Sequence, residues 1–139
     1  MTDIVITSAK RTAIGKFLGS LSGLSAIDLG KIVLNAVVDD SMIDKGMIDE
    51  VIMGQVLTGG NGQNPARQAL LAAGIPNEKS AVTVNQVCGS GLRAISMAAQ
   101  SIISNQSDVV IAGGQESMRN AHHTSNIRNG LKMGDGKIK

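Results

Sequence analysis

The sequence predicts an α/β fold built around a mostly parallel sheet. Short apolar runs rich in Val and Ile alternate along the chain with longer segments that carry helix-start signals and apolar residues at helical spacing. The apolar runs are continuous, which is typical of parallel strands covered on both faces by crossover helices. With 139 residues, the chain is long enough for one domain with a substantial core. We therefore expect right-handed βαβ units.

The first three expected elements are a strand, a helix and a strand. Ile4–Thr7 (IVIT) is a β-branched run and predicts a buried strand. Ser25 and Asp28 have the spacing of a capping box, with Asp in place of the usual Glu, and predict a helix from there to about Asp39. Glu50–Leu57 (EVIMGQVL) predicts a second strand.

The alternation continues in the second half of the chain. Asn64 and Pro65 supply an N-cap and a first-turn proline for a short helix through RQALLAAG. Ala81–Asn85 predicts a third strand, 89–104 a third helix, and Asp108–Ala112 a fourth strand. After Gln115 the pattern gives way to a Gly-, Asn- and Lys-rich segment.

Composition argues against several classes of function. The chain has one Phe and no Trp or Tyr, so it lacks the aromatic platforms on which single-stranded nucleic acids stack. Basic residues gather in 119–139 but are interleaved with Gly, Asn and Ser, so we expect a solvated loop or subunit contact and no nucleic-acid partner. A single cysteine cannot form an internal disulfide, which fits a reducing compartment. No apolar run suits a signal peptide or a membrane span, so we expect a cytoplasmic protein without a membrane partner.

The one cysteine, Cys88, lies in VTVNQVCGSGLRA, between an expected strand and an expected helix. Free Cys is among the most buried residue types, so an inert role in the core is one interpretation. The other is a nucleophile, because the N–H groups and positive end of a helix favour the reactive thiolate over the thiol. Gly89 and Gly91 would also let another group approach the sulfur. The residues alone leave both interpretations open.

The same glycines admit a third interpretation, a dinucleotide-binding turn. Gly89–Ala94 fits the G-x-G-x-x-A pattern between a strand and a helix. That pattern also requires an acidic residue about 20 positions later, at the end of the next strand. Asp108 lies at about that distance but at the start of the strand, and the far end of the strand is Gly113-Gly114. The match is incomplete, and nucleotide binding is the weaker hypothesis.

Several motifs together resemble those of the thiolases, the acetyl-CoA acetyltransferases. VNQVCGSGLRA resembles the nucleophile segment of that family, and KRTAIGKF, MGQVLTGGNGQNPARQALLAAG and AGGQESM resemble its other motifs in order and spacing. The resemblance extends over essentially the whole chain. Ala13 is one departure, since many relatives have Pro after the Arg-Thr pair, and it bears on nothing catalytic.

The resemblance implies an acyltransferase in which Cys88 is the catalytic residue. The thiol would attack an acyl-CoA thioester and become acylated, and a second acetyl-CoA would condense with the acyl group; two acetyl-CoA molecules would give acetoacetyl-CoA, and thiolysis is the reverse. The backbone N–H of Cys88 resembles one donor of the oxyanion hole. The implied substrates are coenzyme A thioesters, as in fatty acid metabolism, with no bound cofactor or metal. The implied partners are acyl-CoA and further copies of the chain, because the full-length family forms tetramers.

The resemblance also divides the chain into two parts. Residues 1–118 resemble the N-terminal half of a thiolase, and 119–139 resemble the start of its tetramerisation loop. In the family, the activating His and the acid/base Cys belong to a second half, and neither His122 nor His123 matches them. We therefore expect the isolated chain to be inactive. The alternatives are a non-catalytic oligomerising fragment and a 3-oxoacyl-carrier-protein synthase-like condensing enzyme.

Overall fold

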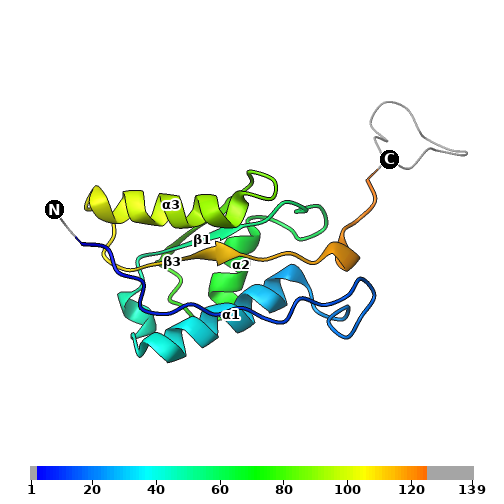
Figure 1. Cartoon of the computed structure of the whole chain (residues 1–139), viewed down its shortest axis with the longest axis horizontal. Coiled ribbons are helices and arrows are strands. Elements are labelled where there is room, and N and C mark those ends of the chain that lie inside the picture. The colour runs from blue at the N-terminus through cyan, green and yellow to red at the C-terminus, as the bar shows by residue number, and fades with distance from the viewer. Residues whose placement is uncertain (1–2, 125–139) are drawn as a thin grey trace, which may run out of the picture.

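A computed structural model of the chain describes residues 3–124 and has an α/β architecture (Figure 1). Two short 3-10 helices, Lys45–Met47 and Met118–Asn120, accompany the main elements. In chain order these elements are α1 (Ala26–Ser41), β1 (Glu50–Gly54), α2 (Pro65–Ala72), β2 (Ser80–Val84), α3 (Ser90–Ile103) and β3 (Val110–Gly114).

The three strands form one parallel sheet in the order β2-β1-β3. Parallel neighbours need crossover connections, and α2 and α3 provide them. The last residue of the central strand, Gly54, pairs with Val84 of β2 and with Gly114 of β3, which are also the last residues of their strands. The carboxyl ends of all three strands are therefore level, and the loops that follow them meet at one edge of the sheet.

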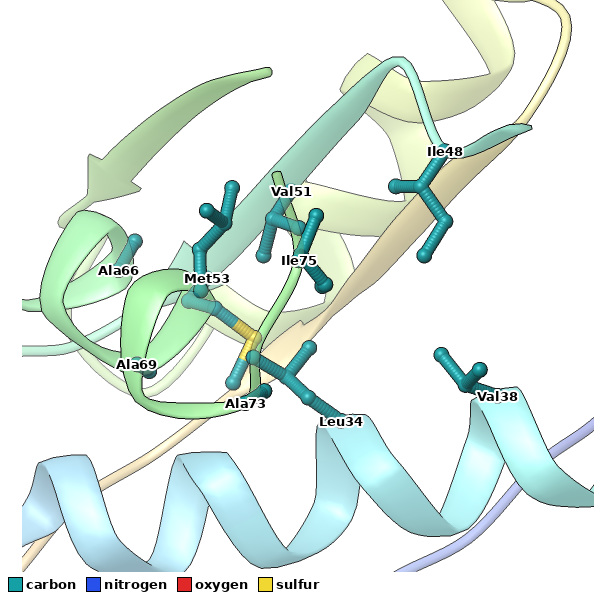
Figure 2. Packing of buried hydrophobic residues seen from close by; sticks show 10 residues of the cluster. Leu34, Val38, Ile48, Val51, Met53, Ala66, Ala69, Ala73 and Ile75 are labelled. Atoms are coloured by element: carbon teal, nitrogen blue, oxygen red, sulfur yellow. The ribbon is translucent and has the colours of Figure 1, made fainter. Parts of the chain in front are cut away.

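Helices cover both faces of this sheet (Figure 1). Val51 and Met53 of β1 face α1 and α2, whereas Ile52 between them packs against Ala94 and Ala98 of α3. Small residues on α3 let that helix approach the sheet closely. The larger cluster, on the side of α1 and α2, contains no aromatic side chain and is shown in Figure 2; it comprises Leu34, Val38, Ile48, Val51, Met53, Ala66, Ala69, Leu70, Ala73 and Ile75.

Both predicted N-caps are confirmed. Ser25 Oγ accepts a hydrogen bond from the backbone N–H of Asp28 at 3.1 Å, and Asp28 Oδ2 accepts from the backbone N–H of Ser25 at 2.9 Å. The Ser25 hydroxyl also donates to Asp28 Oδ2 at 2.6 Å, and this bond, together with the one from the Ser25 backbone N–H, lowers the pKa of Asp28. Asn64 Oδ1 accepts from the N–H of Arg67 at 3.2 Å, and Pro65 is the first residue of α2. Such local signals place a helix start without reference to the rest of the fold.

The predicted buried strand at Ile4–Thr7 is wrong. This segment is irregular, and the side chains of Val5 and Ile6 are 73% and 79% exposed. The N-terminal segment is held to the end of α1 instead, because Ser8 Oγ donates to Asp40 and Lys10 Nζ forms an ion pair with it, both at 2.7 Å. A β-branched run becomes a strand only where a sheet edge pairs with it, and local propensity does not supply that edge.

The other three predicted strands are confirmed with shifted ends. The strand expected at Glu50–Leu57 ends at Gly54, and the strand expected from Asp108 begins at Val110. The second shift has a physical cause: Asp49 Oδ2 accepts the N–H groups of Asp108 and Val109 at 2.8 and 3.0 Å, so these groups are bound to a side chain before pairing starts. Among residues 3–124, no helix is both long and apolar enough to cross a lipid bilayer.

Candidate active site

A hollow of about 300 Å³ lies at the carboxyl edge of the sheet. Its walls come from the loops that follow the three strands, and they include Gln55 after β1, Cys88 after β2 and Glu116 after β3. Parallel α/β sheets bind ligands at this edge. A larger hollow of about 390 Å³ is lined by Ser25, Gly60, Asn61 and 119–122, and it does not include Cys88. We therefore take the smaller hollow as the candidate site.

Cys88 is exposed, and it directly precedes Gly89, the N-cap residue of α3. The interpretation of Cys88 as a buried core residue is therefore wrong. Gly89 has no side chain that could cap the helix, so the positive end of α3 is left open next to the thiol. An accessible thiol beside an open helix N-terminus has the surroundings typical of reactive cysteines.

The turn before Cys88 has an unusual backbone conformation. Val87 has a φ of 51°, in the left-handed region that β-branched residues rarely adopt. Its N–H donates to Asn85 Oδ1 at 3.0 Å, and its carbonyl oxygen accepts from the backbone N–H of Ser90 at 3.1 Å. This sharp turn leads the chain out of β2 and into α3 with Cys88 at the rim of the hollow.

Ser90 holds the inside of this turn. The side chain is buried, and its hydroxyl accepts the N–H of Gln86 at 2.8 Å while it donates to the carbonyl oxygen of Val87 at 2.5 Å. Ser90 also lies against the end of the central strand, since a β-carbon on Gly54 would come within 2.6 Å of the Ser90 carbonyl carbon. A side chain at position 54 would therefore push the start of α3 away from the sheet.

The glycines that flank Cys88 are not required by packing in the same way. A β-carbon on Gly91 would make only ordinary contact with the carbonyl oxygen of Gly113 at 3.9 Å, and one on Gly89 would meet the carbonyl oxygen of Gln86 at 3.3 Å. Neither position is as crowded as Gly54. This agrees with the expectation that Gly89 and Gly91 leave room for another group next to the sulfur.

The loops after β1 and β3 are joined by Glu116. Its two carboxylate oxygens accept the N–H groups of Val56 and Leu57 at 2.8 and 3.2 Å. The neighbouring buried side chain of Gln115 donates to Gln55 Oε1 at 3.0 Å. These bonds join the parts of the hollow's wall that follow β1 and β3.

Three residues of this site have no role that the local sequence predicts. Asn85 and Ser90 lie in VTVNQVCGSGLRA and Glu116 lies in AGGQESM, but the pattern around them indicates no function. The signal that could have found them is position, because polar residues directly after the strands of a parallel sheet lie at its carboxyl edge.

The two histidines do not join Cys88. His122 and His123 are both exposed, and His122 lines the other hollow, against Gly60. Among the described residues that line the hollow at Cys88, none is a histidine. Within the part of the chain that the structure describes, the thiol of Cys88 therefore has no imidazole beside it.

The dinucleotide interpretation also fails on geometry. Asp108, the acid nearest to the expected spacing, precedes β3 and is held at the amino edge of the sheet through Asp49. The glycine turn lies at the opposite, carboxyl edge. An acid at the amino edge cannot bind a ribose whose phosphates sit on the start of α3.

The expected loop region 119–139 is described only in part. Residues 119 and 120 are the last two of the short helix Met118–Asn120, and residues 119–122 line the larger hollow. Positions 125–139 lie outside the described residues. The division of the chain at residue 118 stays a prediction.

Comparison with known proteins agrees with this arrangement. Residues 4–139 match the family described as thiolase, N-terminal domain. The acetyl-CoA acetyltransferase of Cupriavidus necator is 50% identical over 139 residues, which cover 99% of this chain and 35% of the relative. That of Paracoccus denitrificans is 53% identical over 138 residues, and a probable acetyl-CoA acetyltransferase of Escherichia coli is 48% identical over 139, with the same shares covered.

The chain thus spans about a third of the length of the curated relatives that it matches, at 35% of each. Its match to the family model, by contrast, extends over nearly all of its own residues and includes both the parallel sheet and the turn that carries Cys88. The chain therefore belongs to the thiolase family.

Proposed function

We propose that Cys88 accepts an acyl group from acetyl-CoA in an acetyl-CoA acetyltransferase reaction. The observation that carries the proposal is the position of Cys88: an exposed thiol at the open N-terminus of α3, on the rim of a hollow at the carboxyl edge of the sheet. The names of the related proteins supply the substrate class, since they are acetyl-CoA acetyltransferases.

The first half-reaction is a thioester exchange. The Cys88 thiolate attacks the carbonyl carbon of acetyl-CoA, a new C–S bond forms, and the bond to the coenzyme A sulfur breaks. The coenzyme A thiolate leaves and takes up a proton from solvent. The backbone N–H of Cys88 is suited to stabilise the negative oxygen of the tetrahedral intermediate, whereas the N–H groups of Gly89 and Ser90 already donate to the carbonyl oxygens of Gln86 and Val87.

The second half-reaction condenses the acetyl group with a second acetyl-CoA after removal of an α-proton. That step needs a base, and no histidine lines the hollow among the described residues. This chain is therefore expected to form the acyl-enzyme without sustained turnover. The proposal also includes a location in the cytoplasm and coenzyme A thioesters as the substrates. It further includes a role in fatty acid metabolism.

A second candidate function, an oligomerising role without catalysis, is favoured by the outer face of α3. Leu92, Ile95 and Ile103 point away from the sheet and are 74%, 47% and 63% exposed. An apolar surface of this kind is usually covered by another protein surface. Light scattering on purified chain tests it: association that Leu92→Glu abolishes supports this role, and a monomer at high concentration contradicts it.

Intact-mass measurement after incubation with acetyl-CoA tests the acyltransferase proposal. We expect one acetyl increment on the wild-type chain and none on Cys88→Ser, which keeps the size of the side chain but weakens the nucleophile. Iodoacetamide labelling of the same samples checks that the thiol is accessible. An accessible Cys88 that takes up no acetyl group, or an acetyl group that persists in Cys88→Ser, would contradict the proposal.

A further inference from the structure

We infer that Asn85 and Ser90 are positioning residues for Cys88, and that they act by clamping Val87 in its left-handed conformation. The inference rests on the proposed role of Cys88 as the reactive thiol. It adds two residues that the comparisons with known proteins do not assign to any role. The clamp is defined by three hydrogen bonds to Val87: one to its N–H, and two to its carbonyl oxygen.

The conformation of Val87 needs such a clamp. A positive φ of 51° is unfavourable for a β-branched residue, and left alone the backbone would relax into the β region. Burial of the Val87 side chain does not explain the conformation, because this side chain is 65% exposed. The left-handed conformation of Val87 is therefore held by hydrogen bonds to its backbone N–H and carbonyl oxygen, and not by packing of its side chain.

Each polar group of Val87 has a partner. The amide oxygen of Asn85 accepts the Val87 N–H at 3.0 Å. The carbonyl oxygen of Val87 accepts from both the hydroxyl and the backbone N–H of Ser90, at 2.5 and 3.1 Å. Since the same hydroxyl also accepts the N–H of Gln86 at 2.8 Å, Ser90 holds the turn on both sides of the Gln86–Val87 peptide.

The clamp is itself attached to the sheet. Ser90 is buried against the backbone of Gly54 at the end of the central strand, so its hydroxyl has a fixed place. Asn85 donates through its Nδ2 to the carbonyl oxygen of Val56 at a long 3.4 Å, and the N–H of Val56 is bound to Glu116 at 2.8 Å. The turn that carries Cys88 is thus connected by hydrogen bonds to the ends of β1 and β3 as well as to β2.

If the clamp is released, Cys88 moves away from the positive end of α3. The thiol then loses the fixed place that the turn gives it at the rim of the hollow, and it reacts more slowly with an electrophile. The reaction of Cys88 with iodoacetamide measures this directly on the whole chain, because it is the only cysteine in the sequence. The measurement does not depend on acetyl transfer.

The experiment compares second-order labelling rates in native buffer. We expect Asn85→Ala and Ser90→Ala each to slow labelling by about tenfold, the scale expected for misplacing a reacting group by a fraction of an ångström. Matched controls are Asn77→Ala and Ser96→Ala, which remove the same groups at exposed positions away from the hollow. Asn85 is exposed, so its variant is expected to fold even if Ser90→Ala does not.

A double-mutant cycle separates positioning from a general structural effect. Glycine adopts a positive φ without strain, so Val87→Gly removes the need for the clamp. In the Val87→Gly background, Asn85→Ala should slow labelling by less than twofold, on the usual scale of independent sites. The inference is overturned if Asn85→Ala labels like Asn77→Ala, or if its effect is undiminished beside Val87→Gly. If the chain takes up no acetyl group from acetyl-CoA, the proposed function is refuted. The double-mutant cycle still tests the positioning role, because it is measured by iodoacetamide labelling and not by acetyl transfer.

Discussion

Gly54, the last residue of β1, lies in backbone contact with Ser90, the first residue of α3. A β-carbon at position 54 would stand 2.7 Å from the β-carbon of Ser90 and 2.6 Å from its carbonyl carbon. Because the obstructing atoms belong mainly to the backbone of α3, no change of side-chain rotamer relieves the contact. This contact between Gly54 and Ser90 determines how closely the turn at Cys88 approaches the central strand.

Replacing Gly54 by Ala should therefore destabilise the chain and disturb the site together. We expect the free energy of unfolding to fall by about 1–3 kcal/mol, the range for overpacking a close contact. Urea denaturation measures it. Gly59→Ala is the matched control, because a β-carbon there would meet no atom within 4 Å. Equal unfolding midpoints for the two variants would show that the sheet and α3 can separate freely.

Glu116→Gln should loosen the connection between the loops that follow β1 and β3 in the wall of the hollow. The carboxylate accepts two N–H groups, from Val56 and Leu57, whereas an amide offers only one oxygen and turns an N–H₂ group toward the second donor. We expect the free energy of unfolding to fall by about 1 kcal/mol, since a half-buried donor loses its partner. The same change at the exposed Glu78 serves as the control in the urea titration. A loss no greater than that of Glu78→Gln would contradict a role for this carboxylate.

Asp49 should make stability depend on pH. The N–H groups of Val109 and Asp108 donate to its carboxylate and lower the pKa of Asp49 below the ordinary value of 3.8. A carboxyl with a lowered pKa in the folded state stabilises the protein above the pKa of the unfolded chain, and this stabilisation is lost as the pH falls through the folded value. In Asp49→Asn one oxygen can still accept, but no charge remains to be titrated.

We therefore expect Asp49→Asn to be less stable than wild type at neutral pH and to approach wild type as the pH falls below the ordinary carboxyl value of 3.8 and through the lowered pKa of Asp49. Urea midpoints at a series of pH values measure the difference. Asp28 and Asp40 also have lowered pKa values, so the wild-type slope is shared and only the difference between the two chains isolates Asp49. A constant difference across the whole pH range would assign the loss to geometry and not to charge.

Ser25→Ala should destabilise α1 from its first turn. The substitution removes the oxygen that accepts the N–H of Asp28, and with it one half of the capping box. We expect a loss of about 1 kcal/mol in the free energy of unfolding. The urea midpoint measures it, and Ser20→Ala, at an exposed position before the helix, is the comparison. Identical midpoints would mean that packing alone determines where α1 begins.

The sequence predicts those features whose cause lies within a few residues. Ser25 and Asp28 are three positions apart and cap their own helix, and Asn64 and Pro65 do the same for α2, so both starts were predicted correctly. The strand expected at Ile4–Thr7 was wrong because pairing depends on a distant sheet edge. The start of β3 shifted because a carboxylate from Asp49 binds the N–H groups that precede it.

In the candidate site, too, the sequence predicts the features with a local cause and not those that depend on distant residues. Cys88 could be found from its motif and from its place between a strand and a helix. The bonds from Glu116 to Val56 and from Asn85 to Val56 join residues that lie far apart in the sequence, and no local pattern reveals them. They exist only because the parallel register brings the ends of three strands to one level.

This level edge has a consequence for the order in which the site forms during synthesis. Cys88 leaves the ribosome before Glu116, and at about 5–20 residues per second the delay amounts to a few seconds. Until then β3 cannot pair, because parallel neighbours join only after their crossover is complete. The nascent chain thus carries its thiol without a finished hollow around it, and in that interval Cys88 is an ordinary cysteine, open to oxidation or capture by any nearby electrophile.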